Sequence, residues 1–257
     1  MKRKSCSDLL TIDIGNTTTA LAVFCGKKIA HVYRIDSQLP KKGYEYQLSL
    51  ILQKIKKSAC GLRVPIVCSV VPRLTKIVET QIQKQLKIGS KVVGRDVEVP
   101  IENNYHLPKQ VGQDRLMCAY AAKELYGSPC LVIDLGTAIT IDVVSARGVY
   151  EGGMIIPGIR LSLASLFEHA ALLPEIEKVE VPKHLVGKNT RESMLSGVFY
   201  GYGAMLSGLI DMMAKNLKGK PKVIITGGYA ELMKQFLVKK DSRIDADLIF
   251  KGMQLLI

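Results

Sequence analysis

The sequence predicts an α/β fold built from two similar halves. An internal repeat is the first reason: residues 9–17 (LLTIDIGNT) are matched by residues 130–138 (CLVIDLGTA), nearly half of the 257-residue chain further on. Short apolar runs also alternate with segments whose apolar residues recur at helical spacing, as expected for alternating strands and helices. A chain of this length can bury a full core, as one large domain or as two smaller ones.

Each copy of the repeat predicts a strand, a tight turn and a returning strand. An apolar run ends at Asp13 or Asp134, a glycine and small polar residues follow, and apolar residues resume at 20–24 and 141–144. The rest of the first half predicts a strand at 28–35, a helix at 45–59, a strand at 64–71, a helix at 73–86 and a strand at 91–97.

The irregular stretch 99–113, which contains Pro100 and Pro108, is the best linker candidate and divides the chain into expected lobes 1–112 and 113–257. The second half then predicts a helix at 114–125, a loop or bent strand at 148–158, helices at 160–171 and 190–216, a strand at 222–226 and a helix from 229. The long helix contains four glycines, each costing about 1 kcal/mol relative to alanine. Close packing in the core, or a dimer contact, would account for them.

Composition excludes several classes of protein. The six cysteines show no zinc or disulfide spacing, which favours reduced thiols in the cytoplasm. The basic start is followed by a run too short and polar for a signal peptide, and no long apolar stretch predicts a membrane span. The net charge of +13 comes from scattered lysines and arginines, which favours solvated faces, with weak nucleic-acid binding as the alternative.

The two turns of the repeat are candidate phosphate sites. A turn of glycine, threonine and asparagine presents backbone N–H groups and hydroxyls to phosphate oxygens, and the adjacent aspartate can hold a metal ion or water. Two copies predict two lobes facing each other across a cleft. The alternative is a pair of ordinary buried hairpins, which would not need a carboxylate at the end of each apolar strand.

Further motifs lie between and after the two turns. They are YHLP at 105–108, GQDR at 112–115, GGMIIPG at 152–158, GKNT at 187–190 and TGG at 226–228. Together with the two turns, these motifs closely resemble those of the type III pantothenate kinases, in order from about residue 9 to 230. The resemblance implies two actin-like (ribonuclease H-like) lobes, each a mixed five-stranded sheet with flanking helices, and a cleft between them. It also implies ATP-dependent phosphorylation of pantothenate to 4′-phosphopantothenate, the first committed step toward coenzyme A.

The resemblance implies that the first turn binds the ATP phosphates, with Asp13 nearest to Mg²⁺. Asp134 matches the position that binds a monovalent cation, K⁺ or NH₄⁺. The residues matched to ATP binding are Asp13, Ile14, Gly15, Asn16, Thr17, Thr18, Thr19, Ala20 and Thr137. For Asn16 and Thr17 alone, a favoured turn pair is the simpler interpretation.

Asp114 matches the family's general base, which takes the proton from the primary hydroxyl of pantothenate. Arg115 beside it suits a carboxylate, which pantothenate carries. The residues matched to substrate binding are Tyr105, Gly112, Gln113, Asp114, Arg115 and Thr190. In isolation Asp114 could equally cap its helix, and Thr190 also suits the N-cap of the long helix. Cys118 stands where the family usually has asparagine.

The resemblance further implies a homodimer with pantothenate and ATP as its small-molecule partners. Two other functions stay open at this point. One is a nucleotide-sensing regulator on the same fold, and the other is a kinase for another small hydroxyl substrate such as a sugar. The paired Asp114 and Arg115 argue against the regulator, since a sensor needs no general base.

Overall fold

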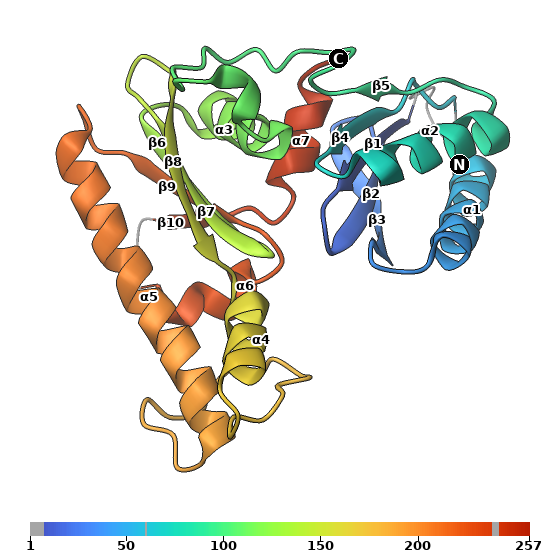
Figure 1. Ribbon diagram of the computed structural model, residues 1–257. Helices are drawn as coiled ribbons and strands as arrows, with labels where there is room; N and C mark the ends of the chain where they lie inside the picture. Colours follow the sequence, from blue (N-terminus) through green and yellow to red (C-terminus); the bar gives the residue numbers. More distant parts are fainter. Residues whose placement is uncertain (1–7, 60, 238–241) are drawn as a thin grey trace, which may run out of the picture. The chain divides into compact units, whose positions relative to one another are not determined.

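The computed structural model describes residues 8–59, 61–237 and 242–257, which divide into two compact units (Figure 1). Unit 1 contains the described residues up to Pro100 together with Lys109–Ala121 and Ile249–Ile257. Unit 2 contains Ile101–Pro108 and the described part of Ala122–Leu248. The division crosses helix α3 (Gln113–Tyr126), so the helix contributes its first residues to one unit and its last residues to the other.

The sheet of unit 1 has five strands in the order β3-β2-β1-β4-β5. The neighbours β3, β2 and β1 are antiparallel, whereas β1, β4 and β5 are parallel. The strands are β1 (Leu9–Ile14), β2 (Thr18–Cys25), β3 (Lys28–Asp36), β4 (Ile66–Ser69) and β5 (Lys91–Val92).

Helices α1 (Lys41–Ser58) and α2 (Pro72–Leu86) pack their apolar sides into the core of this sheet. Leu48 and Leu52 of α1 and Val78 of α2 are fully buried there. Strand β4 ends at Ser69, and Pro72 begins α2, where its missing N–H group is not needed. The helical spacing of the apolar residues therefore predicted both helices, although α1 begins four residues earlier than expected.

Unit 2 repeats the same topology, with strands in the order β10-β9-β6-β7-β8. The neighbours β6, β7 and β8 are antiparallel, whereas β6, β9 and β10 are parallel, as in unit 1. This confirms the predicted duplication into two mixed five-stranded sheets. The strands are β6 (Cys130–Leu135), β7 (Ala138–Val144), β8 (Tyr150–Pro157), β9 (Lys222–Thr226) and β10 (Ser242–Ile244).

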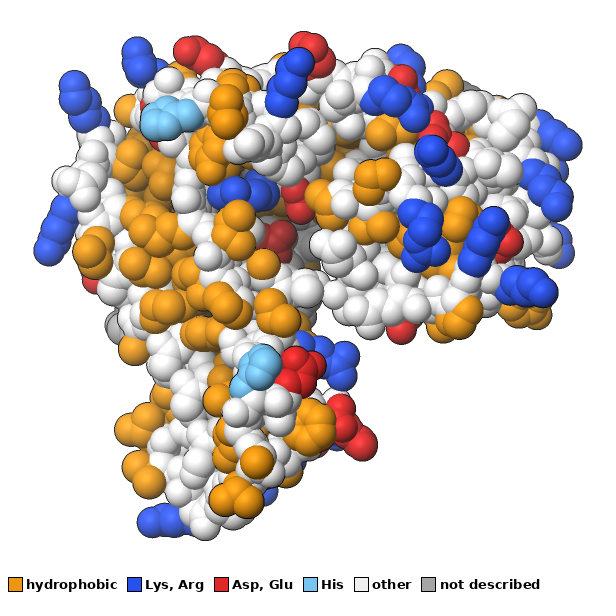
Figure 2. All heavy atoms as spheres, viewed as in Figure 1, with side chains coloured by type: hydrophobic (Ala, Val, Ile, Leu, Met, Phe, Trp, Pro, Cys, Tyr) orange, Lys and Arg blue, Asp and Glu red, His pale blue; other side chains and the backbone are white. Residues whose placement is uncertain are grey.

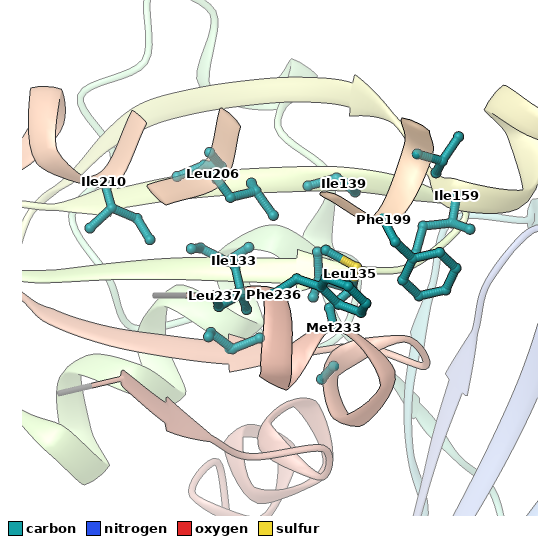
Figure 3. Close-up of a cluster of buried hydrophobic side chains, with 14 of the residues drawn as sticks. Ile133, Leu135, Ile139, Ile159, Phe199, Leu206, Ile210, Met233, Phe236 and Leu237 are labelled. Carbon is teal, nitrogen blue, oxygen red and sulfur yellow. The ribbon is translucent and has the colours of Figure 1, made fainter. Parts of the chain in front are cut away.

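Helix α5 (Thr190–Asn216) provides much of the core of unit 2 (Figure 3). Its Phe199, Leu206 and Ile210 pack with residues of β6 and β7 and with Phe236, which lies on the short helix η2 (Lys234–Phe236). Helices α4 (Ile159–His169) and α6 (Ala230–Met233) complete this core.

The glycines of α5 have two different surroundings. A Cβ atom on Gly203 would lie 2.4 Å from the carbonyl oxygen of Phe236, so this glycine permits close packing in the core. A Cβ atom on Gly197, Gly201 or Gly208 would meet no atom of the described chain within 4 Å. Core packing, the first of the two expected reasons, therefore explains one glycine of the four.

Several elements differ from the prediction. The strand expected at 91–97 spans only Lys91–Val92, because the Asp96 carboxylate accepts a hydrogen bond from the Val92 N–H and the chain turns at Gly94. Of the loop or bent strand expected at 148–158, the strand is confirmed as β8, whereas the helix expected from 229 is only one turn followed by η2. The sequence reading missed β10, the short helix η1 (Pro108–Gln110) and helix α7 (Leu248–Gln254).

Candidate active site

The first turn of the repeat joins β1 to β2 and presents its backbone at a strand end. The Gly15 N–H donates to the Thr18 carbonyl oxygen at 3.0 Å, and a Cβ atom on Gly15 would lie 3.2 Å from that oxygen. Asn16 and Thr18 are exposed, whereas Asp13 and Thr17 are half-buried. The turn therefore offers N–H groups, hydroxyls and one carboxylate to a ligand.

Three residues of the expected phosphate site have buried side chains. Ile14 and Ala20 pack inside unit 1, and Thr19 is fully buried. Only backbone groups of these three residues are therefore available to a ligand.

Asp114 lies in the first turn of α3, at its second residue. Its Oδ1 accepts a hydrogen bond from the N–H of Arg115 at 2.9 Å, and a Cβ atom on Gly112 would lie 2.4 Å from the same oxygen. Glycine at 112 thus leaves room for the carboxylate. This bond satisfies one N–H group in the first turn of the helix, as a capping role predicts. The carboxylate is only half-buried, so part of it also remains accessible to solvent.

Asp13 and Asp114 both act on one buried thiol. Burial raises the pKa of the Cys68 thiol well above its usual value, and the Asp13 and Asp114 carboxylates raise it further. Cys68 lies on β4 directly opposite Asp13 in the parallel ladder. Because electrostatic influence falls with distance, the turn aspartate and the expected base lie near the same point of unit 1.

Gln113 and Arg115 of the GQDR motif also lie in the first turn of α3. A Cβ atom on Gly94 (φ +80°) would overlap the side chain of Gln113, so the Gln113 side chain lies against that glycine. Arg115 is half-buried. Cys118, one turn further along α3, is only 4% exposed, so its small thiol fills a packed position where a larger amide is usual in the family it resembles.

The second turn occupies the equivalent place in unit 2. The Gly136 N–H donates to the Ala138 carbonyl oxygen at 3.1 Å, two residues on, whereas Gly15 in the longer first turn donates to Thr18, three residues on. Asp134 is half-buried, lies opposite Thr140 in the hairpin, and pairs with Thr226 of the parallel strand β9. The aspartates of the two turns therefore have the same position in the two sheets.

Two further glycines pack directly against the second turn. The Gly158 N–H donates to the Thr137 carbonyl oxygen at 3.1 Å, and a Cβ atom on Gly158 would lie 2.2 Å from that oxygen. A Cβ atom on Gly227 (φ +92°) would lie 2.3 Å from Asp134 Oδ1. The PG and GG motifs therefore shape the surroundings of Asp134 and Thr137. The contact between Gly227 and Asp134 was not predicted from the sequence.

Tyr105 belongs to a segment that lies along β8. Asn103 forms a parallel bridge with Tyr150, and the Asn104 side chain donates to the Glu151 carboxylate at 2.8 Å, which lowers the pKa of Glu151. A Cβ atom on Gly152 (φ +106°) would lie 3.3 Å from the ring of Tyr105. The tyrosine ring thus lies against a glycine of the GGMIIPG motif and remains partly exposed.

Thr190 is exposed at the first residue of α5, but it is not the N-cap. The N-cap is Asn189, whose side chain accepts a hydrogen bond from the Glu192 N–H at 2.9 Å, and the Glu192 carboxylate accepts one from the Lys188 N–H. The prediction that Thr190 caps the helix was therefore wrong. Its hydroxyl is not needed for that bond, because asparagine at the preceding position provides the acceptor.

The sequence predicted no zinc site and no membrane span. Among the described residues, no group of three or more His, Cys, Asp or Glu side chains is arranged to hold a metal ion. Within the same residues, α5 alone is long and apolar enough to cross a membrane, and it contributes eight buried residues to the core of unit 2. Figure 2 shows lysine and arginine side chains spread over the visible face without one continuous patch.

The sequence is similar to a known family over most of its length. The family model for type III pantothenate kinase matches residues 9–212. The type III pantothenate kinase of Halalkalibacterium halodurans is 36% identical, covering 96% of this chain and 98% of that protein. The one of Moorella thermoacetica is 37% identical, covering 96% of this chain and 97% of that protein.

Solved structures share the fold at low identity. Component A of the (R)-2-hydroxyglutaryl-CoA dehydratase of Acidaminococcus fermentans aligns with a TM-score of 0.55 at 13% identity, covering 97% of this chain and 96% of that one. A ROK family glucokinase from Streptomyces griseus aligns with a TM-score of 0.54 at 12% identity, covering 97% and 99%. These similarities support the actin-like fold.

Proposed function

Because the chain belongs to the type III pantothenate kinase family, we propose that it transfers the γ-phosphoryl group of ATP to the primary hydroxyl of pantothenate with Asp114 as general base. The products are 4′-phosphopantothenate and ADP, and the reaction is the first step of coenzyme A biosynthesis. The observation that carries the site assignment is that Asp13 pairs with Cys68 across the β1–β4 ladder and that the Asp114 carboxylate also acts on this thiol. Phosphoryl transfer to an alcohol needs a phosphate-binding turn and a base in the same site.

In this proposal the first turn, Asp13 to Ala20, binds the ATP phosphates. The backbone N–H groups and the exposed side chains of Asn16 and Thr18 suit phosphate oxygens. Asp13 provides a carboxylate for Mg²⁺, which in phosphate sites typically takes one or two carboxylates and completes its shell with water and phosphate oxygens. Bound Mg²⁺ neutralises charge that develops during the transfer.

Substrate binding is assigned to the GQDR motif, Tyr105 and Thr190. Arg115 pairs with the pantothenate carboxylate, for which a guanidinium is well suited. Asp114 accepts the hydroxyl proton, and Gly112 leaves room for its carboxylate. Tyr105, Gln113 and Thr190 complete the substrate contacts.

The second turn is assigned to the monovalent cation and to ATP. Asp134 offers a half-buried carboxylate beside Gly136 and Gly227, and a carboxylate oxygen suits K⁺ or NH₄⁺. Thr137 contacts the nucleotide. The tight packing of Gly158 and Gly227 keeps this turn in one conformation.

We also propose that the protein is a cytoplasmic homodimer that uses α5 as its interface. A Cβ atom on Gly197, Gly201 or Gly208 of this helix would meet no atom of the described chain within 4 Å, and Met212 is 63% exposed. A second copy of the helix would cover this apolar face. The reduced cysteines and the absence of zinc spacing agree with a cytoplasmic protein.

The proposed function is tested by ADP release from ATP with pantothenate, with glucose, and with no acceptor, each with and without K⁺. Release that requires pantothenate and K⁺, with 4′-phosphopantothenate detected by mass spectrometry, supports the proposal. Release with glucose alone would indicate a kinase for another hydroxyl substrate. ATP binding without any turnover would indicate the nucleotide-sensing regulator.

A further inference from the structure

Behind the first turn, three buried hydroxyl groups form a hydrogen-bonded chain. Tyr44 of α1 is 0% exposed, and its hydroxyl donates to Thr19 Oγ1 at 2.9 Å. Thr19 Oγ1 lies 2.9 Å from Ser37 Oγ, and both of these residues are buried as well. Because Thr19 accepts from Tyr44, its own proton is available for Ser37.

The chain of hydroxyls connects three separate elements to the turn. Tyr44 lies on α1, Ser37 directly follows β3, and Thr19 is in β2, next to the exposed turn residues. The backbone N–H of Ser37 donates to the carbonyl oxygen of Thr17 at 2.9 Å, so the Ser37 hydroxyl lies on a residue that also contacts the turn backbone. Burying a tyrosine hydroxyl without a hydrogen-bond partner costs folding free energy. An apolar residue would fill the same space without needing a partner.

We infer that Tyr44 and Ser37 are positioning residues that hold the first turn in the conformation that binds the ATP phosphates. Neither touches the nucleotide in this proposal, since both are buried, and both hydroxyls act through Thr19. The inference rests on the proposed role of the turn in binding ATP. It predicts that loss of these hydroxyls weakens ATP binding and leaves pantothenate binding unchanged.

The variants are Tyr44→Phe, which removes one oxygen and keeps the ring, Ser37→Ala and the double variant. Tyr46→Phe is the matched control, because Tyr46 lies on the same helix and is 67% exposed. Each variant is assayed for KM with ATP, KM with pantothenate and thermal unfolding. Loss of one hydrogen bond predicts an increase of about three- to tenfold in KM for ATP, with KM for pantothenate changed by less than about twofold.

The double variant tests whether the two hydroxyls act through one hydrogen-bonded network or independently of each other. Since both hydroxyls act on the same turn, the double variant should weaken ATP binding by less than the product of the two single effects. A purely structural role predicts a lower melting temperature with both KM values unchanged or equally raised, and that result would overturn the inference. So would a Tyr46→Phe variant that behaves like Tyr44→Phe.

The proposed function and the inference fail in different ways. Wild-type protein without pantothenate-dependent turnover would refute the function alone. The inference is then decided by calorimetric titration of ATP into wild type and Tyr44→Phe. Weaker ATP binding in the variant supports the inference, and equal binding refutes it.

Discussion

Replacement of Gly158 by alanine tests how the second turn is held. The new Cβ atom would lie 2.2 Å from the Thr137 carbonyl oxygen and 2.5 Å from the Gly136 carbonyl oxygen, and real Cβ atoms essentially never approach closer than 3.0 Å. Both oxygens belong to the backbone of the turn, so no flexible side chain can move aside. The N–H of Gly158 also bonds the Thr137 oxygen, so relief of the overlap breaks or stretches that bond.

The expected cost follows from this overlap. The φ angle of Gly158 is −74°, which alanine adopts freely. The loss of stability therefore comes from the steric overlap of the new Cβ atom alone. Overpacking of this kind destabilises by about 1–3 kcal/mol. For a chain of this size, each kcal/mol shifts the melting temperature by about 2–4 °C, so we expect a decrease of roughly 2–12 °C.

The measurement is thermal unfolding followed by circular dichroism, together with KM for ATP. Gly43→Ala is the control, because Gly43 lies on helix α1 and its Cβ atom would meet nothing within 4 Å. That variant should be unchanged or more stable by up to about 1 kcal/mol. A Gly158→Ala protein that melts at the wild-type temperature and keeps its KM would refute the packing of this glycine against the turn.

Three other predictions concern the base, the thiols and the interface. Asp114→Asn should lower kcat by roughly 10²–10⁴ if the carboxylate is the base; a helix cap alone predicts an unchanged rate and about 1 kcal/mol lower stability. Cys25 is exposed, whereas burial and two carboxylates raise the pKa of Cys68, so an alkylating reagent at pH 8 should label Cys25 and spare Cys68, as read by peptide mass spectrometry. Labelling of Cys68 at the same rate would contradict its burial. Gly201→Arg should halve the mass measured by light scattering if α5 is the dimer interface, whereas Gly43→Arg should leave it unchanged; equal masses for wild type and Gly201→Arg would argue against this interface.

The repeat was readable from the sequence because its information is local. An apolar run, a carboxylate, a glycine and small polar residues specify a strand and a tight turn by themselves, and both turns have the predicted hairpins. The regular spacing of apolar residues likewise predicted α1, α2 and α5, because a buried helix face needs that spacing wherever the helix packs. The family resemblance was equally local, since it rests on short motifs.

Contacts between distant segments were decided by tertiary structure alone. Nothing near Gly158 or Gly227 in the sequence shows that they lie against Thr137 and Asp134, because those contacts depend on how strands and loops meet. The Tyr44 hydroxyl is a single polar group on an otherwise apolar helix face. Only the fold brings Thr19 within hydrogen-bond distance of this hydroxyl. The sequence thus determined which turns exist and what chemistry they offer, whereas the packing of remote glycines and hydroxyls determined how those turns are held.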